Sequence, residues 1–253
     1  MNSVPLADWM PLVAILAVGV FVQSATGFGA GLLAIPMLLI AGFDMPSAQA
    51  ALMAATLPQN VWGIHRLREH WRPRECVRPA VLRTVALPFG LATLAAIQTL
   101  PDVRLRQIVG GAVLAATVAV MVCVPRPRPA IDRRWGWVAF TASGFFQGVV
   151  GMGGPPMVLW VAAHDWDTAR SRSFLFTIYL FSTPIVWAML YVGFGPRIVT
   201  PLVVALLSTP GLILATAAGL WAGDVLGRRG LRRVTYGMLI AIGVSGLAAP
   251  WWG

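Results

Sequence analysis

The chain has no lysine and few charged residues of any kind. All 19 basic side chains are arginines, nine side chains are acidic, and charged residues make up 11% of the 253 positions, against 58% for hydrophobic residues. Soluble domains carry about 25% charged residues, so this balance excludes a soluble domain and is typical of a polytopic membrane protein. The formal charge of +10 does not indicate a nucleic-acid-binding protein. The arginines cluster between the apolar runs, whereas a nucleic-acid-binding surface gathers them along one face.

Side chains for acid–base or metal chemistry are missing from the interior of the apolar runs. Acidic residues and histidines fall in loops or at the ends of these runs, whereas proton-driven carriers and ion pumps usually hold such a group within the membrane. A phosphate-binding Gly-x-x-x-x-Gly-Lys-Ser/Thr motif is also absent. We therefore expect no cofactor, no metal site and no enzymatic activity. Cysteine is scarce, and we expect Cys76 and Cys123 to be reduced thiols near the cytoplasm.

Eight apolar segments, separated by proline, glycine and charge clusters, predict an all-α membrane protein. They are residues 9–43, 46–64, 76–100, 105–124, 135–163, 174–194, 198–223 and 231–249. A stretch rich in proline and arginine joins the fourth and fifth segments. The predicted organisation is a first transmembrane repeat at 1–124, a cytoplasmic linker at 125–134 and a second transmembrane repeat at 135–253.

A short glycine-rich phrase occurs twice, each time inside a long apolar segment. The copies are Gln23-Ser-Ala-Thr-Gly-Phe-Gly-Ala-Gly31 and Gln147-Gly-Val-Val-Gly-Met-Gly-Gly-Pro155. They lie about 124 positions apart, and further matches such as Pro88 with Pro210 follow at offsets of about 121 to 126. The chain is therefore predicted to be a duplicated unit with one glycine-rich break in each copy.

The two segments that carry the breaks have an unusual length for a membrane helix. One span needs about 20 residues and two need about 40, so about 30 to 35 residues with a central interruption predict a broken helix or a re-entrant hairpin. If the second of these segments re-enters, about fifteen arginines lie inside and about three outside, whereas a single crossing divides them almost evenly. The lopsided count predicts three further transmembrane helices per half and an inverted repeat, with the breaks entering from opposite faces.

Each break exposes the N-terminal end of the helix that follows it. Unpaired N–H groups and the positive end of the helix dipole favour an anion there, and lipid cannot satisfy those groups. Nearby side chains, Gln59 and Tyr179 among them, are uncharged hydrogen-bonding groups suited to an oxyanion. The predicted binding residues are Gln23, Ser24, Thr26, Gly27, Gly29, Gln147, Gly151, Gly153, Gly154, Thr56, Asn60 and Thr177. The alternative is that these small residues serve close helix packing alone, and their duplication at matching places favours binding.

Arg83 is an exception to the rule that charged residues lie outside the apolar segments or at their ends. It lies several residues inside the segment 76–100. A long side chain so near a helix end is expected to snorkel to the membrane interface. The alternative is that it helps to collect anions from the cytoplasm.

The paired phrases, the second extended to Gly144-Phe-Phe-Gln-Gly-Val-Val-Gly-Met-Gly-Gly-Pro155, and the two-half layout resemble the sulfite exporter TauE/SafE family, also called the toluene sulfonate uptake permeases. The similarity covers essentially the whole chain. It implies a multi-pass permease of the bacterial inner membrane that moves sulfite, sulfonates such as sulfoacetate, or related organic anions. It also implies that residues of the two breaks line the substrate site.

The predicted mechanism is export of a small anion held between the opposed breaks, by rocking of the two halves. An inside-negative potential favours the exit of an anion by about 2.3 kcal/mol per charge per 100 mV, so export needs no proton-coupling carboxylate. Two alternatives remain open: a passive anion channel, and an intramembrane hydrolase, which needs a carboxylate or histidine that neither phrase contains. The predicted partners are a small anionic substrate, the lipid bilayer and a second copy of the chain in a homodimer.

Overall fold

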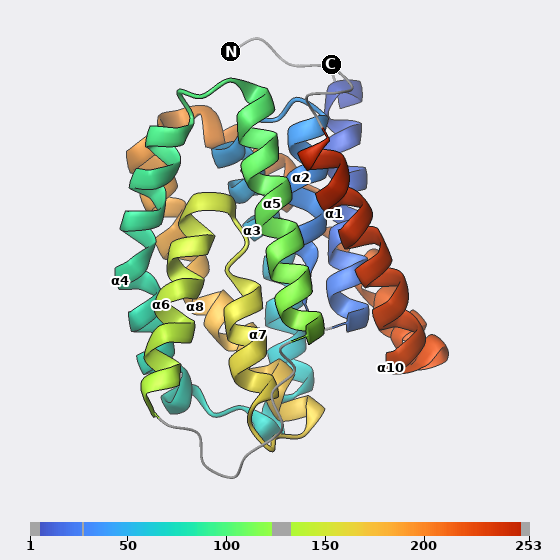
Figure 1. The fold of residues 1–253 in the computed structure, drawn as a ribbon. Coiled ribbons are helices and arrows are strands. Elements are labelled where there is room, and N and C mark those ends of the chain that lie inside the picture. The colour runs from blue at the N-terminus through green and yellow to red at the C-terminus, as the bar shows by residue number, and fades with distance from the viewer. Residues whose placement is uncertain (1–5, 27, 123–132, 249–253) are drawn as a thin grey trace.

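The protein is a bundle of helices, as the sequence predicts (Figure 1). The structure is a computed structural model, which describes residues 6–26, 28–122 and 133–248. All elements in these ranges are helical. In chain order they are α1 (Leu6–Thr26), α2 (Ala30–Ile40), α3 (Met45–Arg66), η1 (Arg68–His70), α4 (Pro73–Ile97), α5 (Asp102–Val122), α6 (Arg133–Val150), α7 (Gly154–Ala162), α8 (Thr168–Phe194), η2 (Gly195–Ile198), α9 (Val199–Leu207) and α10 (Thr209–Leu247).

Both glycine-rich phrases interrupt a helix and reverse the chain. Helix α1 ends at Thr26 and α2 begins at Ala30, while α6 ends at Val150 and α7 begins at Gly154. In each case the short second helix returns alongside the first (Figure 1). We call the pair α1 and α2 the first hairpin, and the pair α6 and α7 the second hairpin.

The two hairpins enter the bundle from opposite ends. The outer ends of the first hairpin meet where the rings of Trp9 and Phe43 lie 6.0 Å apart, at the upper end in Figure 1. The outer ends of the second hairpin meet at the lower end, where a Cβ atom on Gly136 would lie 3.3 Å from Trp160 Nε1. The tips meet inside the bundle, since a Cβ atom on Gly31 would lie 2.9 Å from the carbonyl oxygen of Gly151.

Polar contacts between helix ends close the bundle at both extremities. At the upper end Arg197 Nη2 donates to Gln98 Oε1 at 3.1 Å. At the lower end Arg170 Nη2 lies 3.0 Å from Glu75 Oε2. The lower end gathers the end of α3 and the beginnings of α4, α6 and α8, all of which carry arginines, so the described arginines concentrate at one end of the molecule (Figure 1).

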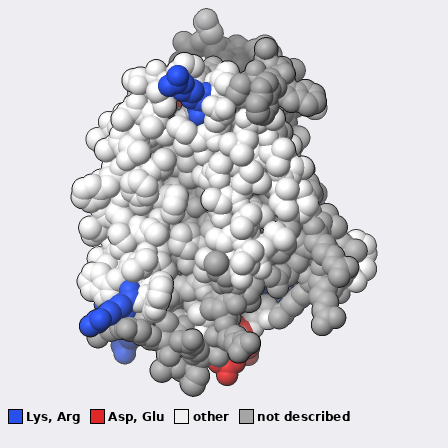
Figure 2. Space-filling view, in the orientation of Figure 1, with Lys and Arg blue, Asp and Glu red and all other residues white. Residues whose placement is uncertain are grey.

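The outer surface between the two ends is apolar. On the face shown in Figure 2, charged side chains of the described residues lie near the two ends and leave the middle uncharged. Within the described ranges, Pro73–Ile97, Val103–Val122 and Thr168–Leu207 are long and apolar enough to cross a membrane. Large apolar side chains such as Val85 and Phe89 point outward from α4. An apolar surface of this extent is typical of a protein that lies in lipid, so these helices are candidate membrane spans.

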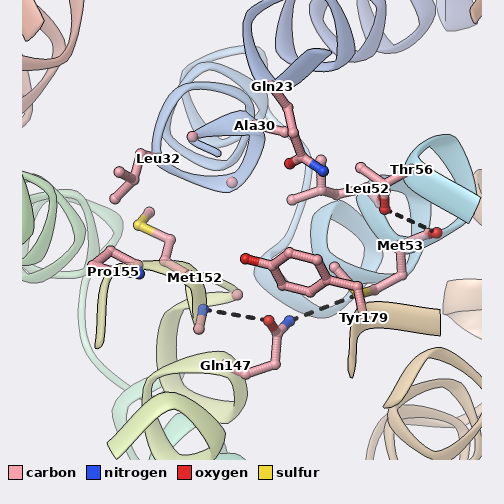
Figure 3. A pocket seen from close by; sticks show the side chains of 15 residues that line it. Gln23, Ala30, Leu32, Leu52, Met53, Thr56, Gln147, Met152, Pro155 and Tyr179 are labelled. Atoms are coloured by element: carbon pink, nitrogen blue, oxygen red, sulfur yellow. Dashed lines mark hydrogen bonds between the residues drawn. The ribbon is translucent and has the colours of Figure 1, made fainter. Parts of the chain in front are cut away.

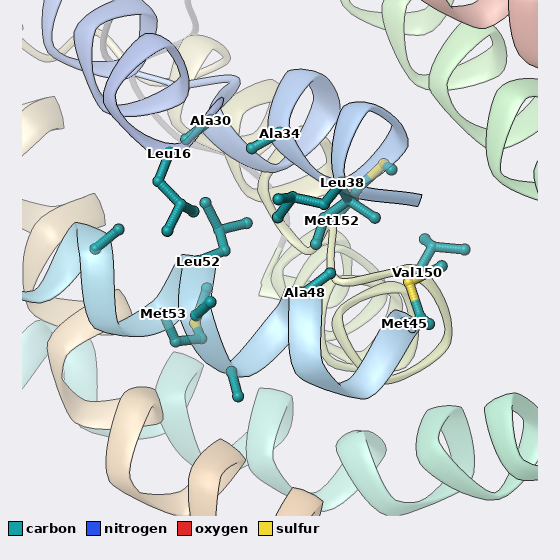
Figure 4. Packing of buried hydrophobic residues seen from close by; sticks show 14 of the residues in the cluster. Leu16, Ala30, Ala34, Leu38, Met45, Ala48, Leu52, Met53, Val150 and Met152 are labelled. Carbon is teal, nitrogen blue, oxygen red and sulfur yellow. The ribbon is translucent and has the colours of Figure 1, made fainter. Parts of the chain in front are cut away.

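Helix α3 occupies the centre of the core. Every residue from Met45 to Thr56 is buried. Figure 4 shows this helix packed against both hairpins: Leu52 and Ala48 lie close to Leu16 of the first hairpin and Met152 of the second. Because one buried helix contacts both hairpins, it fixes the position of one tip relative to the other.

Glycines bring α4 and α6 into backbone contact. A Cβ atom on Gly144 would clash with the carbonyl oxygen of Arg83, one on Gly148 would lie 2.6 Å from the carbonyl oxygen of Leu87, and one on Gly90 would clash with the carbonyl oxygen of Phe145. Small residues permit such close approach of membrane helices, which is stabilised by dispersion contacts. The approach places the polar side chains of α6 directly against α4.

The start of α8 differs from the prediction. Residues 168–173 lie before the predicted apolar segment 174–194, but they are the first turns of this helix. The reason is an N-cap: the side chain of Asp167 accepts a hydrogen bond from the backbone N–H of Arg170 at 2.6 Å. Cys76 is a free, buried thiol, and Cys123 lies outside the described residues.

The last two predicted segments are also divided differently. The segment 198–223 is split between α9 and α10 at Ser208, and α10 then continues to Leu247 through the arginine-rich stretch expected to be a loop. That stretch lacks proline, and its arginine and leucine residues favour a helix, which continues in spite of Gly227 and Gly230. Residues 125–132 of the predicted linker lie outside the described part, and Arg133 and Arg134 belong to α6.

The contact between α4 and α6 gives a direct test of this packing. Replacing Gly144 by leucine should lower the free energy of unfolding by about 1–3 kcal/mol or more, because the added side chain forces the two backbones apart. The measurement is the thermal unfolding temperature of the purified protein in detergent. Gly193→Leu is the matched control, because a Cβ atom on Gly193 would meet no neighbouring atom. Equal destabilisation by the two substitutions would contradict the close approach.

Candidate substrate-binding site

A small cavity with both polar and apolar walls lies between the tips of the two hairpins (Figure 3). Its volume is about 30 Å³. The walls come from both breaks and from the buried faces of α3 and α8. The lining residues are Gln23, Gly29, Ala30, Gly31, Leu32, Leu52, Met53, Thr56, Gln147, Gly151, Met152, Gly153, Gly154, Pro155 and Tyr179.

The cavity brings together more than half of the predicted binding residues. Those that line it are Gln23, Gly29, Thr56, Gln147, Gly151, Gly153 and Gly154. Ser24, Asn60 and Thr177 are buried but do not line it. Gly27 and the side chain of Thr26 lie outside the described residues. The sites contributed by the two copies of the phrase thus face a common space, although they are about half a chain apart.

In the first hairpin, glycine makes the turn possible. Gly29 is the N-cap residue of α2 and has φ of 104°, a left-handed conformation that L side chains rarely adopt. The first turn of α2 then begins at the cavity wall with Ala30, Gly31 and Leu32. The first N–H groups of a helix have no partner within the helix, so this turn directs hydrogen-bond donors and the positive dipole end to the cavity.

In the second hairpin, side chains of α6 hold the broken backbone. Gly151 has φ of 68°, and its N–H donates to the carbonyl oxygen of Gln147 at 3.0 Å. The Gln147 side chain then accepts from the N–H of Gly153 through Oε1 at 3.3 Å, and Ser143 Oγ donates to the carbonyl oxygen of Gly153. Proline in the first turn of α7 fits the prediction, since Pro155 needs no N–H partner there.

Gln49 of α3 links the two halves at this break. It is fully buried. With its amide oriented so that both polar atoms are satisfied, it donates to the carbonyl oxygen of Gln147 and accepts from the N–H of Gly151, both at 3.2 Å. A side chain of the first half therefore satisfies the backbone of the second. The sequence prediction missed this residue, since an isolated glutamine in an apolar run carries no indication of its partner.

The expectation that Arg83 snorkels to the interface is wrong. Only 2% of its surface is exposed, and its guanidinium points into the bundle. Nη1 donates to Ser182 Oγ at 2.6 Å and Nη2 donates to Gln147 Oε1 at 2.8 Å. The reason is the close packing of α6 and α8 on α4, which covers this face of the helix and offers it polar partners. In the sequence, the position of Arg83 several residues inside an apolar segment was the feature that indicated a buried side chain.

Tyr179 of α8 is a further wall residue outside the predicted binding set. Its hydroxyl lies in the middle of the view in Figure 3, between the side chains of Gln23, Gln147 and Met152. A Cβ atom on Gly154 would lie 2.9 Å from this hydroxyl oxygen. The guanidinium of Arg83 lies over the ring of Tyr179, with its Cζ 5.4 Å from the ring centroid. A hydroxyl that reaches the tips of both hairpins can bond to a small ligand held there.

The predicted residues that do not line the cavity bond to their own helix or to a neighbouring helix, or make no side-chain hydrogen bond. Ser24 Oγ donates to the carbonyl oxygen of Val20 and accepts from Gln59 Nε2 at 2.9 Å. Thr177 Oγ1 donates to the carbonyl oxygen of Ser173 at 2.7 Å, a bond within its own helix. Asn60 is fully buried, and neither atom of its amide makes a hydrogen bond.

The residues that line the cavity are uncharged. Its polar walls are amides, hydroxyls and helix N-termini, with a guanidinium behind them, and none of the lining residues is a carboxylate or a histidine. No cluster of potential metal ligands occurs among the described residues. Hydrolysis would need a general base or a metal-bound water, and the lining offers neither.

A polar cavity between two helix breaks, inside a bundle of apolar membrane-spanning helices, defines a transporter of small solutes. Residues 12–246 match the sulfite exporter TauE/SafE family, and the chain belongs to this family of membrane transporters. It is similar to the "Probable sulfite/organosulfonate exporter TauE" of Cupriavidus necator, with 24% identity over 252 residues that cover 97% of this chain and 96% of that protein. No solved structure matches the chain.

The left-handed glycine of the second break provides a test of the local geometry. Alanine at position 151 should cost about 1–2 kcal/mol for its backbone conformation, and its Cβ atom would lie only 2.8 Å from Gln49 Cγ. Gly42→Ala is the control, because Gly42 has φ of 89° but no atom near a Cβ. We expect Gly151→Ala to lower the thermal unfolding temperature more than Gly42→Ala does. The opposite order would contradict the contact with Gln49.

Proposed function

We propose that this protein is a secondary transporter that exports small sulfur-containing or organic anions, such as sulfite or sulfoacetate. The observation that carries the proposal is the cavity between the two hairpin tips, whose polar lining groups are uncharged and include hydrogen-bond donors. The predicted binding residues that line it, together with Tyr179, hold the anion. The family description and the name of the relative in Cupriavidus necator support a sulfur oxyanion as the substrate class.

The proposed architecture is an inverted repeat of residues 1–124 and 135–253. Its support is the entry of the two hairpins from opposite ends of the bundle, with their tips in contact. In such transporters the substrate lies near the bilayer midplane at the repeat interface, and access alternates as one half rocks against the other. The cavity holds only a few water molecules at about 30 Å³, so a bound sulfonate requires the halves to separate. Rocking supplies that movement.

The proposed orientation places the arginine-rich end of the bundle in the cytoplasm of a bacterial inner membrane. Its support is the concentration of arginines where α3 ends and α4, α6 and α8 begin. An inside-negative potential then favours outward movement of an anion by about 2.3 kcal/mol per charge per 100 mV. We also propose a homodimer, because small residues recur on several helices and permit close association in lipid.

The driving force can be measured directly. In proteoliposomes loaded with sulfite, efflux should accelerate when a potential negative inside is imposed, and a dianion should respond more strongly than a monoanion. The control is the same vesicles without protein. An efflux rate that does not change with the imposed potential would exclude the membrane potential as the driving force. An anion channel is the second candidate, and counterflow exchange separates the two, because only a carrier accelerates uptake of labelled anion when unlabelled anion is present on the other side.

Thr56 offers a conservative probe of the cavity wall. Its hydroxyl lines the cavity and donates to the carbonyl oxygen of Leu52 at 3.0 Å. Thr56→Val removes a hydroxyl whose single proton can rotate from the Leu52 carbonyl to a bound anion. The lost hydrogen bond is worth about 1 kcal/mol, so the half-saturating sulfite concentration should rise roughly fivefold. Thr117→Val is the matched control, because Thr117 is equally buried and makes the same type of bond to Val113 away from the cavity. Unchanged transport by Thr56→Val would exclude its hydroxyl from the site.

A further inference from the structure

Arg83 is a buried cation without an anionic partner. Its guanidinium is almost fully covered, and its hydrogen-bond partners in the described part of the chain are two neutral groups, Ser182 Oγ and Gln147 Oε1. Its Nε has no hydrogen-bond partner. No carboxylate of the described residues lies within salt-bridge distance of it. A charge buried in this way is costly unless another charge compensates it.

The guanidinium lies directly behind the cavity wall. Nη2 touches the Gln147 side chain at 2.8 Å, and a Cβ atom on Gly153 would lie 2.9 Å from the same nitrogen. Gln147 and Gly153 both line the cavity, and so does Tyr179, on whose ring the guanidinium rests. One layer of side chains therefore separates the cation from a ligand between the hairpin tips.

Arg83 also fixes the direction of the Gln147 amide. Oε1 of this amide accepts from Arg83 Nη2 and from the N–H of Gly153, so its acceptor faces two donors. Nε2 is left on the cavity side, where its contact is Met53 Sδ at 4.0 Å (Figure 3). Turning the amide over would place its NH₂ group against a guanidinium, which is repulsive. The cavity thus receives a hydrogen-bond donor from Gln147 instead of an acceptor.

We propose that Arg83 supplies the countercharge for the anion in the cavity and, as a positioning residue, orients Gln147 toward it as a donor. This inference rests on the proposed function and adds to it the source of charge selectivity. The bound anion neutralises the charge of Arg83. The protein itself offers no such countercharge, since no acidic residue lies within the predicted apolar segments away from their ends. An uncharged molecule of the same shape gains nothing from the guanidinium and is disfavoured.

Binding to the purified protein tests the charge. The probes are sulfite, methanesulfonate and dimethyl sulfone, the last a neutral molecule of nearly the same shape as methanesulfonate. Affinity is read from the rise in thermal unfolding temperature with ligand concentration. Wild type should bind both anions and ignore the sulfone. Arg83→Met should weaken the binding of both anions at least tenfold, while Arg83→Lys, which keeps the charge, should stay within about fivefold of wild type. Arg78→Met, which removes an arginine five residues earlier on α4, should change little.

A second variant tests the missing countercharge without deleting the arginine. Gln147→Glu keeps the acceptor oxygen and places a carboxylate against Arg83. It should raise the unfolding temperature in the absence of anions and abolish the response to sulfite, because the buried charge is then compensated within the protein.

Two results would overturn the inference and leave the proposed function standing: anion binding by Arg83→Met within about threefold of wild type, or equal loss of binding in Arg83→Lys and Arg83→Met. The second result would show that the fork of hydrogen bonds, and not the charge, is what matters. In the absence of anions, a lower unfolding temperature for Gln147→Glu than for wild type would also contradict the claim that Arg83 lacks a countercharge. If wild type itself responds to neither anion and transports neither, the proposed function and the inference fail together.

Discussion

The structure depends on satisfying two interrupted backbones inside a bilayer. Lipid offers no hydrogen bonds, so every peptide group released at a helix break must find a protein partner, water or a ligand. At the second break Gln147, Ser143 and Gln49 provide such partners, and Gln49 comes from the other half of the chain. The first turn of α2, where a helix has N–H groups without a partner inside the helix, lies at the cavity wall. The same constraint that holds the breaks together therefore also creates a place for a polar solute.

Close backbone packing makes these contacts possible. Glycines on α4 and α6 let the two helices touch, which brings the buried guanidinium of Arg83 within hydrogen-bonding distance of Gln147. The central helix α3 packs against the first hairpin and reaches the tip of the second through Gln49, so it aligns the two tips. The same helix contacts therefore stabilise the fold and position the polar groups around the cavity. A substitution that loosens this packing is also expected to displace those groups.

Much of the site could be predicted from the chain because the phrase is duplicated. Repetition of Gln23 at Gln147, each followed by glycines, indicated both breaks and the residues that now line the cavity. The prediction was less good for Ser24 and Thr177, whose hydroxyls bond within their own helices or to neighbours. A one-dimensional pattern gives the spacing of polar residues along a helix, but the rotation of that helix depends on its neighbours. Arg83 was misjudged for the same reason, since only the packing of α6 and α8 keeps its side chain from reaching the interface.

The sequence by itself determined the membrane environment, the helical class, the family and the location of the two breaks, because composition, hydrophobic run length and glycine placement are local properties of the chain. Tertiary structure decided which polar groups meet. The pairing of Arg83 with Gln147, the bridge from Gln49 and the place of Tyr179 in the cavity wall join residues from different helices. Their contacts arise from the angles and distances at which helices pack, and these are fixed only when all the apolar and small-residue faces are satisfied together.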